Sequence, residues 1–325
     1  MEKILLLGAT GYVGSAFAAE LRRRRLPFYS LTRKEADYTS FEVLWNHLRE
    51  QRPSLVINAA GYRGKPNVDA CETARAETLA GNTLFPQALA HACQAAGIPF
   101  GHVSSGCIYA GAKIEENGQT RIVADLTQPE HRGMIEEGLR RSPGGEISGP
   151  IRGFTENDPP NFSFRSPPCS FYSGTKALAE ETIAPMDNGY LWRLRIPFDE
   201  AGDGNNFLAK IQSYPKVYDN VNSLSHRGDF ARACLDLWKV RAPFGIYNVT
   251  NPGWVTTRWV VQQITKILKP DRKFEYWESD QEFYRFVKAP RSNCILDTGK
   301  LLSAGVAMRP VGEALEEALR SQAKG

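Results

Sequence analysis

"ILLLGATGYVG", residues 4–14, joins a short apolar run to glycines at positions 8, 11 and 14. This order predicts a buried strand that turns directly into a helix. Glycines let the backbone approach a pyrophosphate, and the helix N-terminus offers free N–H groups to it. Glycines in such a place can also be simple turn residues. Three at this spacing, in this context, favour a dinucleotide site formed by Gly8, Thr10, Gly11, Tyr12, Val13 and Gly14.

Strand-like and helix-like segments alternate on both sides of this motif. Strands are predicted at 3–7, 27–31, 54–58, 98–104 and 189–195, and helices at 13–25, 41–51, 76–96 and 171–183. Such alternation predicts an α/β fold, a doubly wound parallel sheet of the Rossmann type. We expect a nucleotide-binding domain at 1–196 and a smaller, mainly substrate-binding α/β region at 197–325. Residues 228–250 are expected to return to the first domain.

The alternating pattern stops between residues 110 and 152, where Gly, Glu, Arg and Pro are frequent. We therefore expect an inserted loop without regular structure there. A run of this length inside a compact domain is usually functional or mobile.

The composition excludes several classes of protein. The 325 residues carry 40 basic and 36 acidic side chains, so the net charge of +4 is too dilute for a nucleic-acid footprint. The six cysteines have no C-x-x-C spacing and there is no His cluster, which predicts reduced thiols and no metal site. No apolar stretch approaches the roughly 18 residues of a membrane helix or the core of a signal peptide. A cytoplasmic protein without a membrane partner is expected.

Residues at the end of the second predicted strand should determine whether NAD(H) or NADP(H) binds. The sequence there reads Thr32-Arg33-Lys34, and a basic pair without a carboxylate suits a 2′-phosphate, whereas an acidic residue would hold the ribose of NAD. NADP(H) is therefore favoured over NAD(H), with ordinary loop charges as the alternative. Asp37 is a candidate for contact with the adenine, and Tyr38 is assigned to the same cofactor site. Asp in such a loop is as often a turn cap.

"YSGTK", residues 172–176, places a phenol and an ammonium one helical turn apart. A nearby lysine and a cofactor ribose would tune Tyr172 as the proton donor to a carbonyl that accepts hydride. The hydroxyl of Ser105 could orient the same oxygen. The Tyr/Lys spacing alone is weak evidence, since it is common on exposed helices.

Four segments together carry a resemblance: "GATGYVG", "NAAG" at 58–61, "SSGCIY" at 104–109 and "YSGTK". In this order they resemble the extended short-chain dehydrogenase/reductases over nearly the whole chain. The closer likeness is to the sugar-nucleotide reductases of deoxysugar synthesis, both dTDP-4-dehydrorhamnose reductase and the bifunctional 3,5-epimerase/4-reductase that makes UDP-L-rhamnose. "NAAGYRGKPNVDACE" at 58–72, "NNFLAKI" at 205–211, "GIYNVTNPG" at 245–253 and "APRSN" at 289–293 are similar to segments of the latter.

The resemblance implies roles for individual residues. Ser105, Tyr172 and Lys176 match the reductase triad. Relatives that dehydrate sugars carry Asp and Glu at the positions of Gly106 and Cys107, so dehydration is not expected here. The epimerase/reductases, GDP-L-fucose synthase included, carry a cysteine at the second position, and the rhamnose enzyme pairs it with a lysine that falls on Lys210. These two would act on the C–H bonds beside a 4-keto group. Taken alone, Cys107 is more often packing and Lys210 a helix-surface lysine.

Other assignments follow from the same resemblance. Asn58, Ala59, Ala60, Gly61 and Asn82 are expected at the cofactor, together with Tyr172 and Lys176, and a solvent-facing Asn82 is equally open. Asn67, Ser105, Gly106, Asn206 and Arg291 are expected at the substrate, with Arg291 near its phosphates. The alternatives are turn asparagines and a surface arginine.

The predicted activity is NAD(P)H-dependent reduction of a nucleotide-linked 4-keto-6-deoxyhexose, with 3,5-epimerisation, giving an L-rhamnose-type nucleotide sugar. One alternative is a reductase or an epimerase alone, acting on another nucleotide sugar. Another is a non-catalytic regulatory subunit, as in the reductase-like subunit of methionine adenosyltransferase. The insert at 110–152 and a smaller one at 165–169 flank the expected sugar pocket. They suggest a lid or an oligomer contact, and a homodimer stays open.

Overall fold

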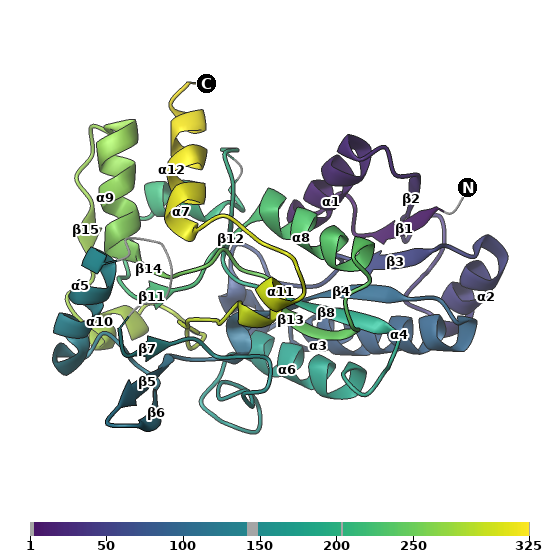
Figure 1. Cartoon of the computed structure of the whole chain (residues 1–325), viewed down its shortest axis with the longest axis horizontal. Coiled ribbons are helices and arrows are strands. Elements are labelled where there is room, and N and C mark those ends of the chain that lie inside the picture. The colour runs from purple at the N-terminus through teal and green to yellow at the C-terminus, as the bar shows by residue number, and fades with distance from the viewer. Residues whose placement is uncertain (1–2, 142–148, 203, 325) are drawn as a thin grey trace.

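The computed structural model describes residues 3–141, 149–202 and 204–324. Its centre is a six-stranded parallel sheet in the order β13-β8-β4-β3-β1-β2 (Figure 1). The strands are β1 (Ile4–Leu7), β2 (Phe28–Leu31), β3 (Leu55–Asn58), β4 (Phe100–Ser105), β8 (Gly189–Leu194) and β13 (Gly245–Asn248). The predicted doubly wound parallel sheet is confirmed. Because the chain runs outward from β1 to β2 and then crosses back to β3, the topological switch point lies between β1 and β3.

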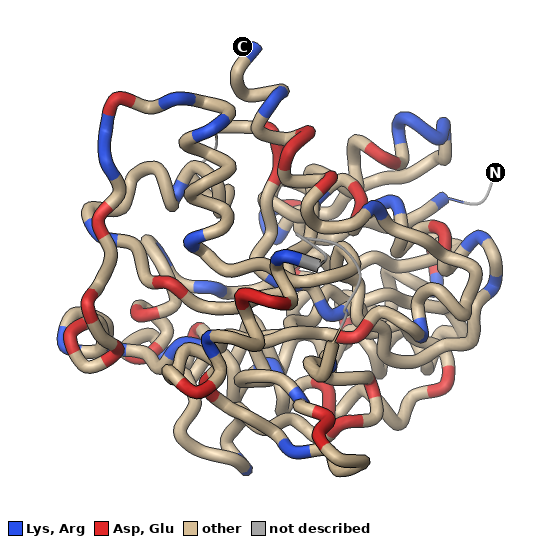
Figure 2. Tube along the Cα trace, turned by 60° about the vertical axis from the view of Figure 1, so that its left-hand side comes forward, with Lys and Arg blue, Asp and Glu red and all other residues tan. Residues whose placement is uncertain are grey.

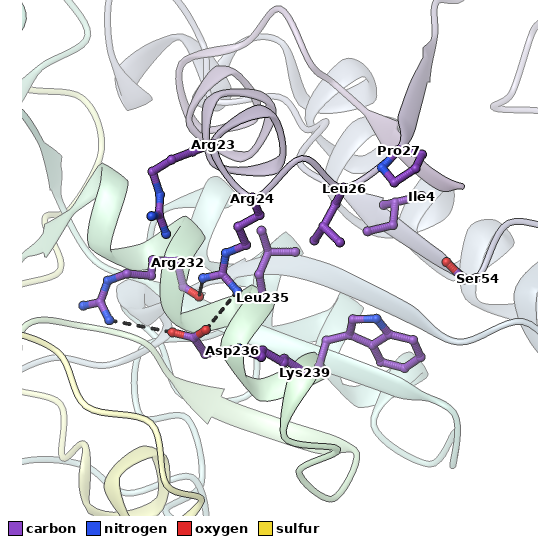
Figure 3. A pocket seen from close by; sticks show the side chains of 11 residues that line it. Ile4, Arg23, Arg24, Leu26, Pro27, Ser54, Arg232, Leu235, Asp236 and Lys239 are labelled. Atoms are coloured by element: carbon purple, nitrogen blue, oxygen red, sulfur yellow. Dashed lines mark hydrogen bonds and ion pairs between the residues drawn. The ribbon is translucent and has the colours of Figure 1, made fainter. Parts of the chain in front are cut away.

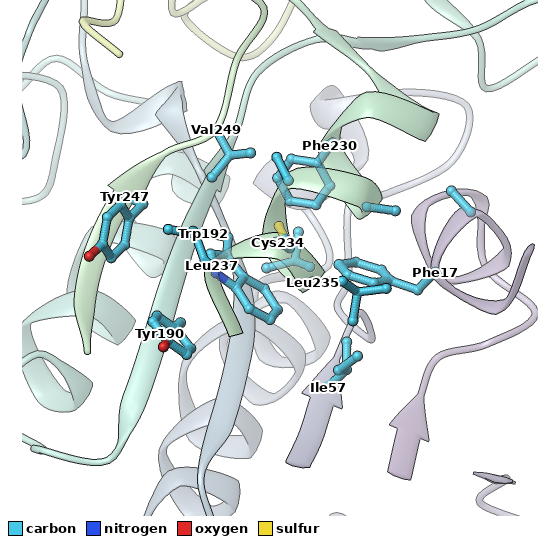
Figure 4. Packing of buried hydrophobic residues seen from close by; sticks show 14 of the residues in the cluster. Phe17, Ile57, Tyr190, Trp192, Phe230, Cys234, Leu235, Leu237, Tyr247 and Val249 are labelled. Carbon is cyan, nitrogen blue, oxygen red and sulfur yellow. The ribbon is translucent and has the colours of Figure 1, made fainter. Parts of the chain in front are cut away.

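Helices cover both faces of this sheet, as the alternation along β1 requires. Ile4 and Leu6 belong to the core under α1 (Tyr12–Arg23) and α8 (Arg227–Lys239), where Phe17 stacks on Trp192 at 5.8 Å (Figure 4). Leu5 and Leu7 belong to the core of the other face, under α2 (Phe41–Gln51), α4 (Phe85–Ala96) and α6 (Phe171–Ile183). Both faces of the sheet are therefore buried from solvent, which explains the continuous apolar runs of the strands.

The long helix predicted at 76–96 is interrupted. It consists of α3 (Arg75–Leu79), a π-helical turn at Ala80–Leu84 and α4. Single π turns inside helices often occur at functional sites, and this one carries the buried Asn82.

A second apolar core joins the later part of the chain. It packs α7 (Phe207–Ser213), α9 (Thr257–Leu268) and α12 (Val311–Gln322) together. Smaller elements complete this later part of the chain: β9 (Pro197–Phe198), β10 (Lys216–Val217), β11 (Val221–Asn222), β12 (Ser225–His226), β14 (Val255–Thr256), β15 (Glu275–Tyr276) and α10 (Asp280–Tyr284). By contrast, α11 (Gly299–Ser303) packs with the large sheet through Leu301. Between these elements in sequence, α8 and β13 belong to the large sheet and its cover.

Residues 110–152 are not the structureless loop predicted. They form β5 (Ala112–Glu116), β6 (Gln119–Val123), α5 (Arg132–Arg141) and β7 (Ile151–Arg152), with a three-stranded sheet in the order β6-β5-β7. Asn117 and Gly118 both have positive φ and close the β5–β6 hairpin. Asn-Gly is the strongest local hairpin signal, and it was overlooked. Ile114 and Ile135 pack in one core with Trp254, so the insert has a hydrophobic anchor. Residues 142–148 of the predicted loop lie outside the described residues.

Short 3₁₀ turns η1 (Val68–Glu72), η3 (Gly106–Ile108) and η4 (Pro129–His131) complete the structure. Basic and acidic residues are interspersed along the chain trace (Figure 2). Among the described residues, no helix has the length and apolar character needed to cross a membrane. Within the same ranges, no three His, Cys, Asp or Glu side chains are grouped to hold a metal ion.

Candidate active site

Two pockets are candidates for the active site. The larger, about 600 Å³, lies at the amino ends of the strands, beside Ile4, Pro27 and Ser54 (Figure 3). Its one lining carboxylate, Asp236, is already paired with Arg24 at 2.9 Å and with Arg232 at 3.7 Å. The smaller, about 490 Å³, lies on the carboxyl side of β4 and β8 and is lined by Asn67, Cys107, Tyr172, Arg195, Lys210 and Arg291 among others. Ligands of doubly wound sheets bind at the carboxyl ends of the strands, so this cleft is the candidate active site.

Close backbone contacts require glycine at positions 8 and 14 of the turn. Gly8 has φ of 77°, and a Cβ on it would lie 2.6 Å from the amide nitrogen of Ala60. A Cβ on Gly14 would lie 1.9 Å from the carbonyl oxygen of Gly8, so only glycine lets α1 approach the turn. Thr10 is exposed at the turn and Val13 packs on the core. No described side chain caps α1 at Gly11, which leaves its first N–H groups for an anion.

Tyr12, in this turn, contacts two residues of the later part of the chain. Its hydroxyl donates to Asp199 at 3.0 Å, and the Arg227 guanidinium lies 4.4 Å from the centre of its ring. Asp199 also binds Asn206, which caps α7 by accepting from the amide of Leu208 at 3.0 Å. Asn206 is fully buried and its amide is occupied by these contacts, so it lies outside the lining of the cleft.

The "NAAG" segment is held by two buried asparagines. Asn58 accepts from the amide of Ala60 at 3.0 Å, and its amide group contacts the His102 ring at 3.1 Å. Asn82 accepts from the amide of Tyr62 at 2.9 Å and donates to the carbonyl of the same residue at 2.6 Å. Asn82 is fully buried, so the solvent-facing alternative is wrong. A Cβ on Gly61 would lie 3.7 Å from the Lys176 Nζ, so this loop borders Lys176.

The loop after β2 carries acidic as well as basic side chains. Arg33 and Lys34 are exposed, but Glu35 accepts from the amide and the hydroxyl of Thr32 at 2.8 and 2.7 Å. A carboxylate therefore follows the basic pair directly, and the predicted preference for a 2′-phosphate did not take it into account. Asp37 accepts from Thr39 in the turn-capping arrangement. Tyr38 is 7% exposed and packs beside Phe85, which places its ring in the core.

Tyr172 lines the cleft, whereas Ser105 and Lys176 are buried residues beneath this part of the structure. Ser170 caps the start of α6, which places Tyr172 in the first turn and Lys176 one turn later. Burial raises the pKa of the Tyr172 phenol, and a hydrogen bond with Ser105 opposes this shift. Lys176 donates to the carbonyl of Val103 at 3.2 Å. Burial lowers the pKa of Lys176 to about 8, while the charge of Glu180 opposes the shift.

Cys107 lies on η3, directly after β4, and is half-buried in the cleft lining. Its amide donates to Ser105 Oγ at 3.1 Å, and its sulfur accepts from Nη1 of Arg195 at 2.9 Å. Lys210 lines the same cleft from α7. Sequence reasoning missed Arg195. The available signal was the pair of arginines, Arg193 and Arg195, at the end of a strand predicted to be buried.

The remaining substrate candidates lie at the rim. Arg291 lines the cleft and donates to Asp69 at 2.7 Å and to the carbonyl of Ala289 at 2.9 Å. Asn67 also lines it, and caps η1 by accepting from the amide of Asp69 at 2.8 Å. A Cβ on Gly106 would lie 2.6 Å from Leu296 Cδ1, so a side chain there would have to displace that leucine.

The chain is similar to known proteins over most of its length. The model of the family described as the RmlD substrate binding domain matches residues 1–130. The chain is 28% identical over 312 residues to the bifunctional dTDP-4-dehydrorhamnose 3,5-epimerase/dTDP-4-dehydrorhamnose reductase of Arabidopsis thaliana, covering 96% of this chain and 90% of that protein. The predicted resemblance to the rhamnose reductases is thereby confirmed.

Longer relatives and solved structures extend the comparison. A trifunctional UDP-glucose 4,6-dehydratase/UDP-4-keto-6-deoxy-D-glucose 3,5-epimerase/UDP-4-keto-L-rhamnose-reductase of Arabidopsis thaliana is 31% identical over 301 residues. The match covers 92% of this chain but only 39% of that protein. The crystal structure of the L780 UDP-rhamnose synthase from Acanthamoeba polyphaga mimivirus has the same fold, with a TM-score of 0.78 and 24% identity. It aligns over 98% of this chain and 99% of that one.

Proposed function

We propose that the protein reduces the 4-keto group of a nucleotide-linked 4-keto-6-deoxyhexose with hydride from a nicotinamide dinucleotide, and epimerises carbons 3 and 5 of the same sugar. The product is a nucleotide sugar of the L-rhamnose type. The observation that carries this proposal is that Tyr172, Cys107 and Lys210 line one cleft. Ser105 hydrogen-bonds with Tyr172 and with the amide of Cys107, and Lys176 lies one turn after Tyr172 on α6.

The reductive half needs a hydride donor and a proton donor. The glycine turn and the adjoining loops suit a dinucleotide, which supplies the hydride to carbon 4 when bound. Tyr172 gives its phenolic proton to the developing alkoxide oxygen. Since burial raises the pKa of the phenol, Tyr172 stays protonated and ready to donate at neutral pH. Ser105 orients the same oxygen.

The epimerising half needs a base and an acid. The 4-keto group makes the hydrogens on carbons 3 and 5 acidic, and a thiol and a lysine in one cleft can remove and return a proton. Gly106 and Cys107 stand where dehydrating relatives carry Asp and Glu, so dehydration is not part of this proposal.

We propose NADPH as the reductant. Arg33 and Lys34 are exposed at the end of β2, where a 2′-phosphate would lie in a Rossmann domain. Glu35 points its carboxylate at Thr32 within the same turn, so it is already occupied. A non-catalytic regulatory subunit is disfavoured, because a binding protein has no need of the complete Ser105, Tyr172 and Lys176 set.

The test is to incubate the protein with NADPH and either UDP- or dTDP-4-keto-6-deoxyglucose, and to follow the loss of nicotinamide absorbance. Oxidation of NADPH with at least one of these substrates is expected. UDP-glucose, which has no keto group, is the control and should cause none. Binding of NADPH without oxidation on either keto sugar would contradict the proposed reductase.

A further inference from the structure

Arg195 is a buried cation at the wall of the cleft. It directly follows β8 and its side chain is 2% exposed. Nη1 donates to the Cys107 sulfur at 2.9 Å, and Nη2 donates to the Ser292 carbonyl at 2.5 Å and to the Asn222 side chain. The amide of Arg195 donates to Ser225 Oγ at 3.1 Å, so backbone and side chain are both fixed.

The partners of Arg195 leave its charge without a carboxylate. Among the described residues, no Asp or Glu lies within ion-pair distance of its guanidinium, whereas Arg193, two positions earlier on the strand, is paired with Glu180 at 2.7 Å. Burying a guanidinium is costly unless a negative group compensates it. Asn222 and Ser292 offer only neutral oxygens. The Cys107 thiol is the one ionisable group at hydrogen-bond distance in this part of the structure.

We propose that Arg195 is a positioning residue that holds the sulfur of Cys107 in the cleft and stabilises it as the thiolate. A cation beside a cysteine favours its thiolate, and a charge-assisted hydrogen bond also fixes its direction. This inference rests on the proposed function and adds a direction to it: Cys107 removes the proton and Lys210 returns one.

The resulting step balances. The thiolate takes the proton from carbon 3 or 5, and the electron pair of that C–H bond moves through the adjacent carbon to the 4-keto oxygen, forming an enolate. The enolate then collapses and the same carbon receives a proton from the Lys210 ammonium on the other face. The sulfur ends as a thiol and Lys210 as an amine, and proton exchange with solvent restores both.

Direct binding of the substrate diphosphate by Arg195 is the competing role. Three of its N–H groups already donate hydrogen bonds, to Cys107, Asn222 and Ser292. The Nε atom is buried and has no hydrogen-bond partner among the described residues. Arg291 also lines the cleft and is more exposed than Arg195, although its guanidinium is paired with Asp69 at 2.7 Å.

The test measures alkylation of individual thiols by iodoacetamide at pH 7, with peptide mass spectrometry as the readout. Cys169, the other half-buried cysteine, is the internal reference. In the wild-type protein, Cys107 should react about ten-fold faster than Cys169 or more, since the thiolate is the reacting species. Arg195→Met should remove this advantage, and Arg195→Lys, which keeps the charge, should restore part of it. Arg165→Met, which removes an exposed arginine paired with Glu181, is the matched control.

Equal reactivity of Cys107 and Cys169 in the wild-type protein would overturn the inference, and this arm does not depend on whether a variant folds. A second arm follows hydrogen exchange at carbons 3 and 5 in heavy water. Arg195→Lys should slow this exchange several-fold more than it slows reduction of an already epimerised substrate. Equal losses in both reactions would indicate a merely structural role and overturn the inference. Arg195-dependent alkylation without any exchange in the wild type would support the inference and reject the proposed epimerisation.

Discussion

Burial acts in opposite directions on the two groups of the Tyr/Lys pair. It raises the pKa of the Tyr172 phenol, which therefore keeps its proton, and lowers the pKa of the Lys176 ammonium to about 8. A protonated phenol suits the donation of a proton to an alkoxide. A lysine that loses its charge just above neutral pH makes the site sensitive to alkaline conditions.

Tyr172→Phe should reduce NADPH oxidation by roughly 10²–10⁴-fold, the usual cost of losing a general acid. Cofactor binding should stay nearly intact, because the glycine turn at 8–14 holds the dinucleotide. Stopped-flow absorbance measures the first effect and fluorescence titration with NADPH the second. Tyr276→Phe, a tyrosine on β15 outside the cleft, should behave like the wild type. Near-normal turnover of Tyr172→Phe would reject the proton-donor role.

The reductase should lose activity as the pH rises through about 8. The pKa of Lys176 is lowered by burial, so the ammonium is present below this pH and lost above it. Its charge stabilises a negative oxygen on the neighbouring phenol during proton donation. A kcat/KM profile from pH 6 to 10 measures the effect. In Lys176→Arg, where the charge persists, any remaining activity should show no such fall. A flat wild-type profile up to pH 10 would count against this role.

Among single residues, motif reasoning predicted the Tyr172 and Lys176 pair, since their spacing is local along one helix. Arg195 escaped it, because its contact with Cys107 spans 88 positions and no local pattern reports such a pairing. Asn206 and Tyr38 were assigned to binding surfaces, whereas one caps α7 and the other packs in the core. The same residue type can cap a helix, pack in the core or line a pocket, and only the structure distinguishes these roles.

At the scale of elements, the helices at 41–51 and 171–183 have the bounds that were predicted. Their apolar periodicity and flanking serines are local signals. The helix predicted at 76–96 contains a π turn that periodicity cannot reveal. The β5–β6 hairpin could have been predicted from Asn117-Gly118, but the surrounding polar residues obscured its alternation.

The loop after β2 should decide between the two cofactors. Arg33→Asp should lower the preference for NADPH over NADH by about ten-fold or more, because a hydrogen bond between charged groups is worth roughly 1.5–3 kcal/mol. The ratio of kcat/KM for the two reductants is the measurement. Arg25→Asp alters another exposed arginine, at the opposite end of β2, and should leave that ratio unchanged. An unchanged ratio in Arg33→Asp would mean that this loop does not read the phosphate.

At the scale of the molecule, the cleft is assembled from segments far apart in sequence. Cys107 comes from the end of β4, Tyr172 from α6, Lys210 from α7 and Arg291 from a late loop. The contact between Tyr12 and Asp199 spans 187 positions and joins the glycine turn to the segment that carries α7. The parallel sheet could be predicted from repeated βαβ units, whereas this convergence depends on tertiary packing.

The central claim is that one cleft performs both epimerisation and reduction, and isotope incorporation tests it most directly. UDP- or dTDP-4-keto-6-deoxyglucose should be converted with NADPH in heavy water, and the product examined by NMR and mass spectrometry. We predict an L-rhamnose-type product with deuterium at carbons 3 and 5, and with the hydrogen of NADPH at carbon 4. Cys107→Ser should nearly abolish deuterium incorporation yet still reduce a substrate that is already epimerised. A reduced product from the wild-type protein without deuterium at carbons 3 and 5 would contradict the claim.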